Sequence, residues 1–575
     1  MRKIAWIFCL LSSLHVSAQR KNYSIQMADA AVSTWIDSTS ILSGKTDPSK
    51  MGILLFAMEA VWNATGNGQY FNYINKSVDQ LVQSDGSIKK LQPGDASMAA
   101  QMLMVYEVTK KDRYRKAAEL VVRQSLPGKG DAGLPTQTAL RLAQSIIFNV
   151  AYSQLFQSDS SFSALSASVI SLTGRTLVYE ELPLPGFAFL SSIDKIPGDP
   201  LRKQELVHLF QAYAKKTRAL QDTSSGKWPS GGKTDAAGEY ATTALIAYTF
   251  AKGVRMGYLE EDYLASASKA YAFILKQFRG AKGAKDRGAA DKSGGTETIR
   301  ESFMGDPSRV GSFILAATEM EMLETATAGK GKKVVLDYYY NNEWQKDVTG
   351  KDVRWHYTWE DRSNSGYHML GHVFMSNGAK ISRLETSAAD LAKQKASLYI
   401  IVDPDTEKET AKPHFIEQAD ITHIKKWVGD GGVLLLLGND KGNAEFTHLN
   451  ELAASFGIHF NEDKQNTVID DMFEQGVVMS PAGSAVFGTQ AKKLFIKEFS
   501  SLALQSPAEA VLTKGDIKVM ALSKYGNGWV VALGDPWIYN EYIDGRKLTT
   551  DFQNYPATVE WVKWMLSLSK KTSLR

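Results

Sequence analysis

Two carboxylates in the first half of the chain stand where proton transfer or sugar binding could take place. Asp95 follows Pro93-Gly94 at the start of a predicted helix over 96–109, and Glu239 begins a predicted helix that runs to Ala251. A carboxylic acid held at such a position can exchange a proton with a substrate or accept a hydrogen bond from a hydroxyl group. For Asp95, helix capping is the alternative, because its oxygens would satisfy free backbone N–H groups.

Three aromatic residues extend this pattern toward a saccharide ligand. Trp228 ends a polar loop before the second helix, Tyr240 follows Glu239 directly, and Trp62 lies in an internal repeat. An aromatic ring can stack on the C–H face of a sugar while carboxylates bind its hydroxyls or move protons. We therefore predict Asp95 and Glu239 as catalytic residues and the three aromatics as substrate-binding residues. Trp228 could equally be a core aromatic.

The composition argues against several other chemistries. The chain has one cysteine, Cys9, and the first half has a single histidine after the N-terminal segment, His208. His-based triads are therefore not expected there, and disulfides, a cysteine nucleophile or Cys-ligated zinc are not expected once Cys9 is removed. With 66 basic and 62 acidic residues the net charge is +4, too small to favour nucleic acid as a partner. No cofactor or metal is predicted.

The N-terminal segment has the layout of a secretory signal peptide over residues 1–18. A positively charged start precedes the apolar run Ile4–Leu14, and small residues end at Ala18. We expect cleavage after Ala18 and a periplasmic or secreted protein. A lipoprotein is less favoured, because Cys9 lies in the middle of the apolar run. No later stretch reaches about 18 consecutive apolar residues, so no membrane anchor is predicted.

The first half of the chain shows helical periodicity and an internal repeat. Val61–Tyr70 is similar to Val105–Tyr114, which lies 44 residues later. A single helical hairpin cannot bury its apolar face, so hairpins must stack, and about six can close into a ring. We therefore predict an (α/α)6 toroid over residues 25–327 rather than an open solenoid. Helices are expected at 26–38, 51–65, 69–83, 96–109, 112–125, 136–156, 161–174, 203–220, 239–256, 261–277 and 308–325.

Beyond a polar linker at 328–333, short β-rich runs alternate with helices, which indicates a mostly parallel sheet covered on both faces. We predict a flavodoxin-like α/β domain over 333–570, with an antiparallel pair near its end across the turn at 526–528. Strands are expected at 334–340, 397–402, 433–437, 467–469, 519–522 and 529–533, and helices at 363–375, 386–392, 418–428, 444–455 and 555–569.

Two groups of polar residues in the second half are weaker candidates. Asp403-Pro404-Asp405 and Asn439-Asp440 each follow an apolar strand, at the carboxyl end where α/β sheets bind ligands, although loop capping explains them as well. His368 and His372 share one helix face at a spacing compatible with a metal pair. No glutamate follows the first histidine, so capping or surface packing is the favoured explanation.

Several stretches follow one another with the order and spacing of a known family over most of residues 25–325. They are the repeat with Val78–Val82 and Asp85–Ile88, the loop Gln221–Trp228, Glu239–Ala244 with Ala251–Tyr258, and Asp306–Glu321. They resemble the unsaturated glucuronyl and rhamnogalacturonyl hydrolases, glycoside hydrolase families 88 and 105. The resemblance implies an (α/α)6 barrel and an aspartate that protonates the C4=C5 double bond of an unsaturated uronic acid. Asp95 falls at the first of the family's two active-site aspartates.

The second active-site aspartate of the family is missing. Alignment back from the end of the same helix places Ala139 at its position, and an alanine cannot transfer a proton. Two interpretations remain open. Either a rebuilt site uses Asp95, Glu180, Glu181 or Glu239, or the chain is a catalytically altered relative that binds carbohydrate.

The second half resembles the glutamine-amidotransferase-like accessory domains that follow such barrels in some secreted bacterial proteins. It has no cysteine nucleophile, so amidotransferase chemistry is excluded. The sequence therefore predicts a hydrolase that releases unsaturated uronic acid from the non-reducing end of rhamnogalacturonan-like lyase products. A carbohydrate-binding relative without turnover is the alternative, and a separate activity with metal near His368 and His372 is a third reading. The sequence names no protein partner.

Overall fold

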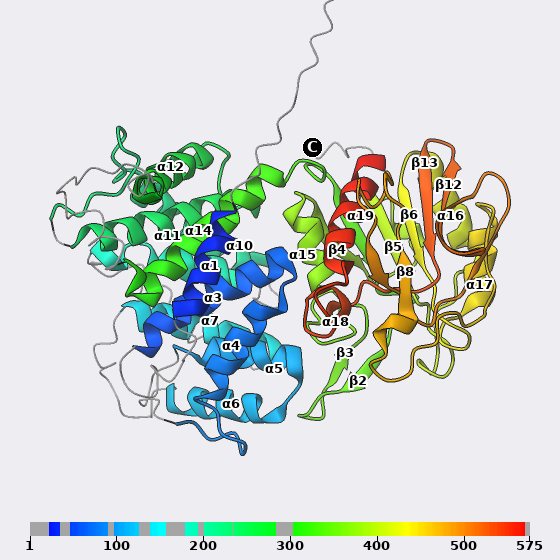
Figure 1. Cartoon of the computed structure of the whole chain (residues 1–575), viewed down its shortest axis with the longest axis horizontal. Coiled ribbons are helices and arrows are strands. Elements are labelled where there is room, and N and C mark those ends of the chain that lie inside the picture. The colour runs from blue at the N-terminus through cyan, green and yellow to red at the C-terminus, as the bar shows by residue number, and fades with distance from the viewer. Residues whose placement is uncertain are drawn as a thin grey trace, which may run out of the picture.

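The computed structural model describes residues 22–34, 47–89, 97–125, 139–156, 179–193, 200–232, 234–282 and 303–569. The predicted signal peptide and Asp95 lie outside these residues. The described chain forms a helical half followed by a half that contains the main sheet (Figure 1). None of the described helices combines the length and apolar character that a bilayer crossing requires.

Six of the described helices form a closed inner ring in the helical half. Each contacts the next inner helix along the chain, and α14 returns to pack against α3. Further helices lie outside the ring, each against an inner helix (Figure 1). The inner helices are α3 (Pro48–Thr65), α5 (Ala99–Thr109), α7 (Ala139–Phe156), α9 (Leu184–Ser192), α11 (Ala236–Arg255) and α14 (Pro307–Thr325). The outer ones are α1 (Tyr23–Thr34), α4 (Gly68–Asp79), α6 (Asp112–Ser125), α10 (Pro200–Arg218) and α12 (Tyr263–Lys282). The ring agrees with the predicted toroid.

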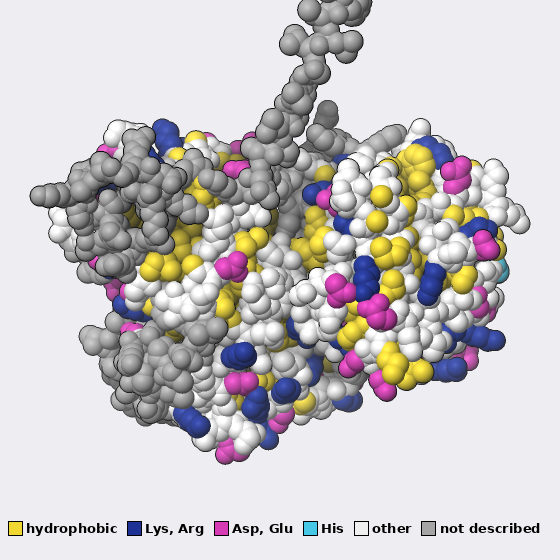
Figure 2. All heavy atoms as spheres, in the orientation of Figure 1, with side chains coloured by type: hydrophobic (Ala, Val, Ile, Leu, Met, Phe, Trp, Pro, Cys, Tyr) yellow, Lys and Arg dark blue, Asp and Glu magenta, His cyan; other side chains and the backbone are white. Residues whose placement is uncertain are grey.

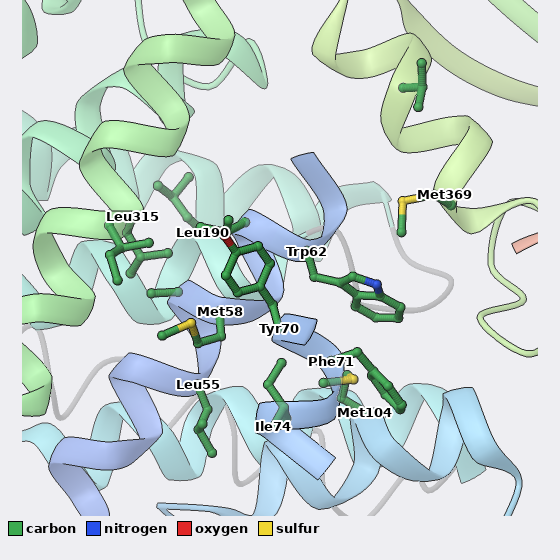
Figure 3. Close-up of a cluster of buried hydrophobic side chains, with 14 of the residues drawn as sticks. Leu55, Met58, Trp62, Tyr70, Phe71, Ile74, Met104, Leu190, Leu315 and Met369 are labelled. Atoms are coloured by element: carbon green, nitrogen blue, oxygen red, sulfur yellow. The ribbon is translucent and has the colours of Figure 1, made fainter. Parts of the chain in front are cut away.

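Inner and outer helices differ in how their apolar residues are distributed. α3 and α5 are apolar on nearly all sides, whereas α4 and α6 concentrate their apolar residues on one face. Glycine lets inner helices approach closely, since a Cβ on Gly311 of α14 would lie 2.8 Å from the backbone nitrogen of Leu54 in α3. Leu55, Met58 and Leu315 lie together in the buried cluster of the ring (Figure 3).

A seven-stranded sheet in the order β11-β12-β13-β6-β5-β1-β4 forms the centre of the second half. Its strands are β1 (Lys333–Asp337), β4 (Lys380–Leu384), β5 (Leu398–Val402), β6 (Val433–Leu437), β11 (Glu509–Lys514), β12 (Ile517–Tyr525) and β13 (Gly528–Leu533). The strands from β13 to β4 are parallel, and β12 and β11 are antiparallel at one edge. Numbered along the chain, the parallel strands alone have the order 2-1-3-4-5. The predicted α/β organisation with a late antiparallel pair is confirmed.

Three two-stranded ribbons lie outside the main sheet. They pair β2 (Trp344–Lys346) with β3 (Asp352–Arg354), β7 (Ile458–Phe460) with β10 (Leu502–Leu504), and β8 (Val477–Met479) with β9 (Lys493–Phe495). The predicted strand at 467–469 is wrong, because this segment has no strand partner and Ile469 is 59% exposed.

Helices cover both faces of the main sheet. They are α16 (Gln418–Gly429) and α17 (Phe446–Ala454) on one face, and α15 (His368–Ser376) and α19 (Asn554–Leu568) on the face toward the ring (Figure 1). Successive residues of β1 point to opposite faces, so Val335 joins the core under α16 and α17. Val334 and Leu336 join the core that continues into the inner ring. The two halves therefore share one hydrophobic core.

Polar contacts also join the two halves. The indole Nε1 of Trp62 in α3 donates a hydrogen bond to the backbone oxygen of Asp544 at 2.7 Å. Arg362, which is 7% exposed, pairs with Glu59 of α3 at 2.7 Å. Met369 of α15 extends toward Trp62 at the same interface (Figure 3). Sheet and ring are thus held by both apolar packing and buried polar contacts.

Basic and acidic side chains are interspersed on the face of the molecule that Figure 2 shows. This mixture agrees with the small net charge of +4. Most of the large aromatic side chains of the described residues are buried, but Trp344 of the β2–β3 ribbon is 53% exposed.

Candidate functional site

The N-terminal ends of the inner helices gather at one end of the ring. Asp47, Asp235 and Asp306 cap α3, α11 and α14 by accepting hydrogen bonds from backbone N–H groups. Side chains connect neighbouring helix starts, as where Gln144 of α7 donates to the backbone oxygen of Ser49 in α3 at 2.7 Å. This end of the ring is where the sequence predicts sugar-binding carboxylates.

Two ion pairs join the starts of α3, α11 and α14. Lys50 pairs with Asp306 at 2.7 Å, and Arg309 pairs with Asp235 at 2.9 Å. Burial alone would raise the pKa of Asp306, but hydrogen bonds from Lys50 and Ser308 outweigh it, and the pKa is lowered. This end of the ring therefore places the ionised carboxylate of Asp306 beside two cations, Lys50 and Arg309, each paired with an aspartate and each able to hydrogen-bond an anionic group.

Sequence reasoning missed these two ion pairs. The available signal was an Asp-Pro pair before an apolar run, at 47–48 and again at 306–307. Aspartate is a favoured N-cap and proline is favoured in the first turn, so each pair marks a helix start. Which basic residue meets which cap depends on ring closure, which the local sequence does not specify.

Glu181 reaches the helix start at which the family pattern lacks its aspartate. It ends the 3-10 helix η1 (Tyr179–Glu181), just before α9. Its Oε1 accepts a hydrogen bond from the backbone N–H of Ala139, the first residue of α7, at 3.2 Å. A carboxylate from a different segment therefore stands beside the alanine, as the rebuilt-site interpretation requires.

Glu239 lies in the first turn of α11, and residues of the loop that precedes this helix bind its carboxylate. Oε2 pairs with Lys227 Nζ at 2.7 Å, and Oε1 accepts a hydrogen bond from the backbone N–H of Ser230 at 2.9 Å. The side chain is 14% exposed. These contacts fix the loop before α11, and the catalytic role of Glu239 stays a prediction.

The three aromatic candidates are buried. Trp228 is 0% exposed, and its Nε1 donates to the backbone oxygen of Thr217 at 2.7 Å. Tyr240 is 9% exposed with its ring 5.4 Å from that of Phe273, and Trp62 is 2% exposed. For Trp228 this is the position of a core aromatic. Stacking on a sugar would first require each of these rings to be uncovered.

A cavity of about 700 Å³ lies between the two halves, at the carboxyl edge of the main sheet. Asp403, Asn439 and Asp535 line it from the ends of β5, β6 and β13. Lys110, which follows α5, lines it from the helical half. The structure thus brings together two polar groups that the sequence placed at the ends of separate strands.

Two buried aspartates of this cavity have strongly shifted acidities. Burial raises the pKa of Asp403 well above its usual range, although a hydrogen bond from Asn439 Nδ2 to its Oδ2, at 2.9 Å, opposes the shift. Burial likewise raises the pKa of Asp535 well above its usual range. Hydrogen bonds from the Tyr357 and Tyr539 hydroxyls also oppose the shifts of Asp403 and Asp535, although neither Oδ1 atom has a partner in good geometry among the described residues. The cavity wall therefore contains two buried carboxyl groups whose hydrogen bonding is incomplete.

His368 and His372 do not form a metal site in the described part of the chain, where no cluster of three metal-binding side chains occurs. His372 Nδ1 lies 3.1 Å from Ser376 Oγ of the same helix. Burial and the cations Arg255, Lys252 and Arg362 lower its pKa to about 3. A site surrounded by cations repels a metal ion, so the packing interpretation of the pair is the better one.

Comparison with known proteins extends this description. Residues 186–324, from α9 to α14, match the family model described as Glycosyl Hydrolase Family 88. The family 105 glycoside hydrolase of C. acetobutylicum ATCC 824 is 18% identical with a TM-score of 0.42, over 52% of this chain and 99% of that one. A family 88 glycosyl hydrolase from Bacteroides vulgatus is 15% identical with a TM-score of 0.37, over 52% and 98%. The mmIFT52 N-terminal domain is 20% identical with a TM-score of 0.29, over 37% and 90%. The family match confirms the predicted resemblance: in residues 186–324 this chain is similar to Glycosyl Hydrolase Family 88.

Proposed function

We propose that the chain is a hydrolase that releases unsaturated uronic acid from the non-reducing end of rhamnogalacturonan-like oligosaccharides left by polysaccharide lyases. The observation that carries this proposal is the match of residues 186–324 to Glycosyl Hydrolase Family 88. The carboxylates and cations gathered at the N-terminal end of the ring support it. Carboxylates can transfer the protons of the reaction, and cations can bind the uronate group.

In the proposed reaction, a carboxylic acid donates a proton to C4 of the C4=C5 double bond, and water adds at C5. The hydrated sugar then opens and releases its neighbour. We assign proton donation to Asp95. Glu181 is the proposed second carboxylate and takes the proton from the attacking water, since it lies beside Ala139. Lys50 and Arg309 are the proposed partners of the uronate carboxylate.

A catalytically altered relative that binds carbohydrate without turnover is the second candidate function. Ala139 favours it, because the position where the family carries an aspartate has no side chain that can move a proton. This candidate keeps the basic residues of the ring, which would hold an anionic sugar without any chemical step.

The two functions are distinguished by the ultraviolet absorbance of the substrate double bond. The purified protein should abolish the absorbance of lyase products from pectin, ulvan or glycosaminoglycans, and the Asp95→Asn variant should lose most of this activity. Full activity of the variant would contradict the assignment of Asp95. Saturable binding of these products without loss of absorbance would favour the carbohydrate-binding relative.

We also propose that the protein is periplasmic or secreted and that its second half is a flavodoxin-like accessory domain. The strand order 2-1-3-4-5 supports the flavodoxin-like type. The layout of residues 1–18 supports export. N-terminal sequencing of the protein recovered from the periplasm or medium should begin at Gln19, and an intact Met1 in the cytoplasm would contradict export.

A further inference from the structure

The cavity at the carboxyl edge of the main sheet is separate from the helix starts of the ring. It opens where parallel α/β sheets place their ligands, outside the carboxyl ends of the strands. Its volume of about 700 Å³ lies within the range of roughly 300–1,000 Å³ that small-molecule sites occupy. No step of the proposed hydrolysis uses it.

The buried acceptors of this cavity point to a ligand that donates hydrogen bonds. Asp403 is 3% exposed and Asp535 is 2% exposed, and among the described residues the Oδ1 atom of each has no partner in good hydrogen-bond geometry. The hydroxyls of Tyr357 and Tyr539 lie near the two carboxyl groups and partly offset their burial. A buried polar atom without a good partner destabilises the folded protein, and a ligand that supplies the partner removes this cost. Asn439 occupies only the other oxygen of Asp403. A ligand rich in hydroxyl groups supplies the missing donors.

Flat aromatic surfaces lie beside these acceptors. Trp355 lines the cavity and is only partly buried. Its ring stacks on that of His356, with the two centroids 4.4 Å apart and an angle of 5° between the ring planes. Tyr357 and Tyr539 also line the cavity, with ring centroids 5.5 Å apart and an angle of 25° between their planes. Acceptors next to an aromatic face suit a pyranose, which has hydroxyls at its edge and C–H groups on its faces.

The charges of the lining select against an anionic ligand. Six carboxylate side chains and three Lys or Arg side chains line the cavity. All three basic residues are already paired with carboxylates. The distances are 3.9 Å from Lys110 to Asp361, 3.2 Å from Lys497 to Glu498 and 2.6 Å from Arg546 to Asp544. With acidic side chains in the majority and the basic ones paired, the lining offers a uronate no net attraction, whereas a neutral sugar meets no charge repulsion.

From these observations we propose that the cavity binds a neutral sugar unit, as a second carbohydrate site between the two halves. Asp403 and Asp535 accept hydrogen bonds from its hydroxyls, and Trp355 covers one face of its ring. The site holds the neutral part of a glycan and takes no part in bond cleavage.

The test is saturation-transfer NMR and calorimetric titration of the full chain with D-galactose, L-rhamnose, D-glucose and D-glucuronate. The neutral sugars should include at least one saturable ligand, and D-glucuronate should bind more weakly than that ligand. Trp355→Ala and Asp535→Asn should each raise its dissociation constant at least tenfold. The matched control is Trp344→Ala, which removes a tryptophan that is 53% exposed and does not line the cavity, and it should leave binding unchanged.

Three results would overturn the proposal. They are the absence of saturable binding for all neutral sugars, tighter binding of D-glucuronate, and unchanged binding in both cavity variants. Thermal unfolding of each variant shows whether that variant still folds. If Asp535→Asn does not fold, the dissociation constant of Trp355→Ala alone tests the proposal. Loss of absorbance with lyase products tests the ring separately, so failure of either site leaves the other result intact.

Discussion

At the scale of single residues, Glu181 is the side chain whose role can be separated most cleanly. As a hydrogen-bond acceptor for Ala139 N–H it stabilises the start of α7, and as an acid or base it would serve catalysis. Glu181→Gln keeps an acceptor oxygen but cannot exchange a proton. We expect turnover of unsaturated oligosaccharides to fall by about 100-fold or more with little change in melting temperature.

The control for this variant is Glu260→Gln, at an exposed glutamate, which should leave turnover unchanged. Turnover equal to that of the unaltered protein in Glu181→Gln would mean that Glu181 is only a helix cap.

The residue types of the candidate site were predictable, but their surroundings were not. A tryptophan in a polar loop, such as Trp228, is compatible both with a sugar-stacking surface and with a core position. The residues that determine which of the two it occupies come from elsewhere in the chain. The backbone oxygen of Thr217 accepts a hydrogen bond from the indole N–H of Trp228. Phe250 packs edge-on against the same indole, with the ring centroids 5.7 Å apart. The sequence likewise named Glu181 as a substitute for the missing aspartate without placing it beside Ala139.

At the scale of secondary structure, helical periodicity predicted most helices of the ring but missed α9. Every residue of α9 from Leu184 to Leu190 is buried, so its apolar residues form a continuous run with no polar face. Periodicity alone does not identify a helix that is buried on all sides. The apolar runs of α3 and α5 were long enough to predict a helix, whereas α9 has only nine residues. Pro185 and Gly186 also weaken the helix signal in the sequence. Gly186 is nevertheless suited to its place, because a Cβ there would lie 2.4 Å from the side chain of Thr249 in α11. The missing inner helix is therefore the one whose sequence is most adapted to burial.

The close approach of α14 to α3 makes a prediction for Gly311. A Cβ there would lie 2.8–2.9 Å from backbone atoms of Ile53 and Leu54, which cannot move aside as a side chain can. Gly311→Ala should therefore destabilise the protein by about 1–3 kcal/mol, measured as a lower melting temperature. Gly429→Ala is the matched control at the end of α16, where the nearest atom to the added Cβ is 3.7 Å away. An unchanged melting temperature for Gly311→Ala would mean that the two helices can separate without cost.

At the scale of the whole molecule, the ring and the sheet should unfold together, because they share a core and a buried ion pair. Arg362 is 7% exposed, and Glu59 is the acid that pairs with it across the interface. Glu59→Ala leaves the buried guanidinium without this partner, which should cost about 3–5 kcal/mol and separate one melting transition into two. Glu261→Ala breaks the pair with Lys330, whose side chains are 79% and 73% exposed, and should change little. A single unshifted transition in Glu59→Ala would contradict a coupled interface.

The same interface should make the whole protein sensitive to acid through His372. Burial, with the cations Arg255, Lys252 and Arg362, lowers its pKa to about 3, against 6.5 for an ordinary histidine. Between these two values the unfolded chain binds a proton that the folded protein does not, so the free energy of unfolding falls as the pH falls. The stabilising contribution is complete above pH 6.5 and is lost toward pH 3, by on the order of 1 kcal/mol per pH unit. Calorimetry at pH 8, 7 and 5 should show a smaller drop from pH 7 to 5 in His372→Gln than in the unaltered protein. Both proteins should change equally between pH 8 and 7, and an equal drop at pH 5 would show that His372 is protonated within the folded interface.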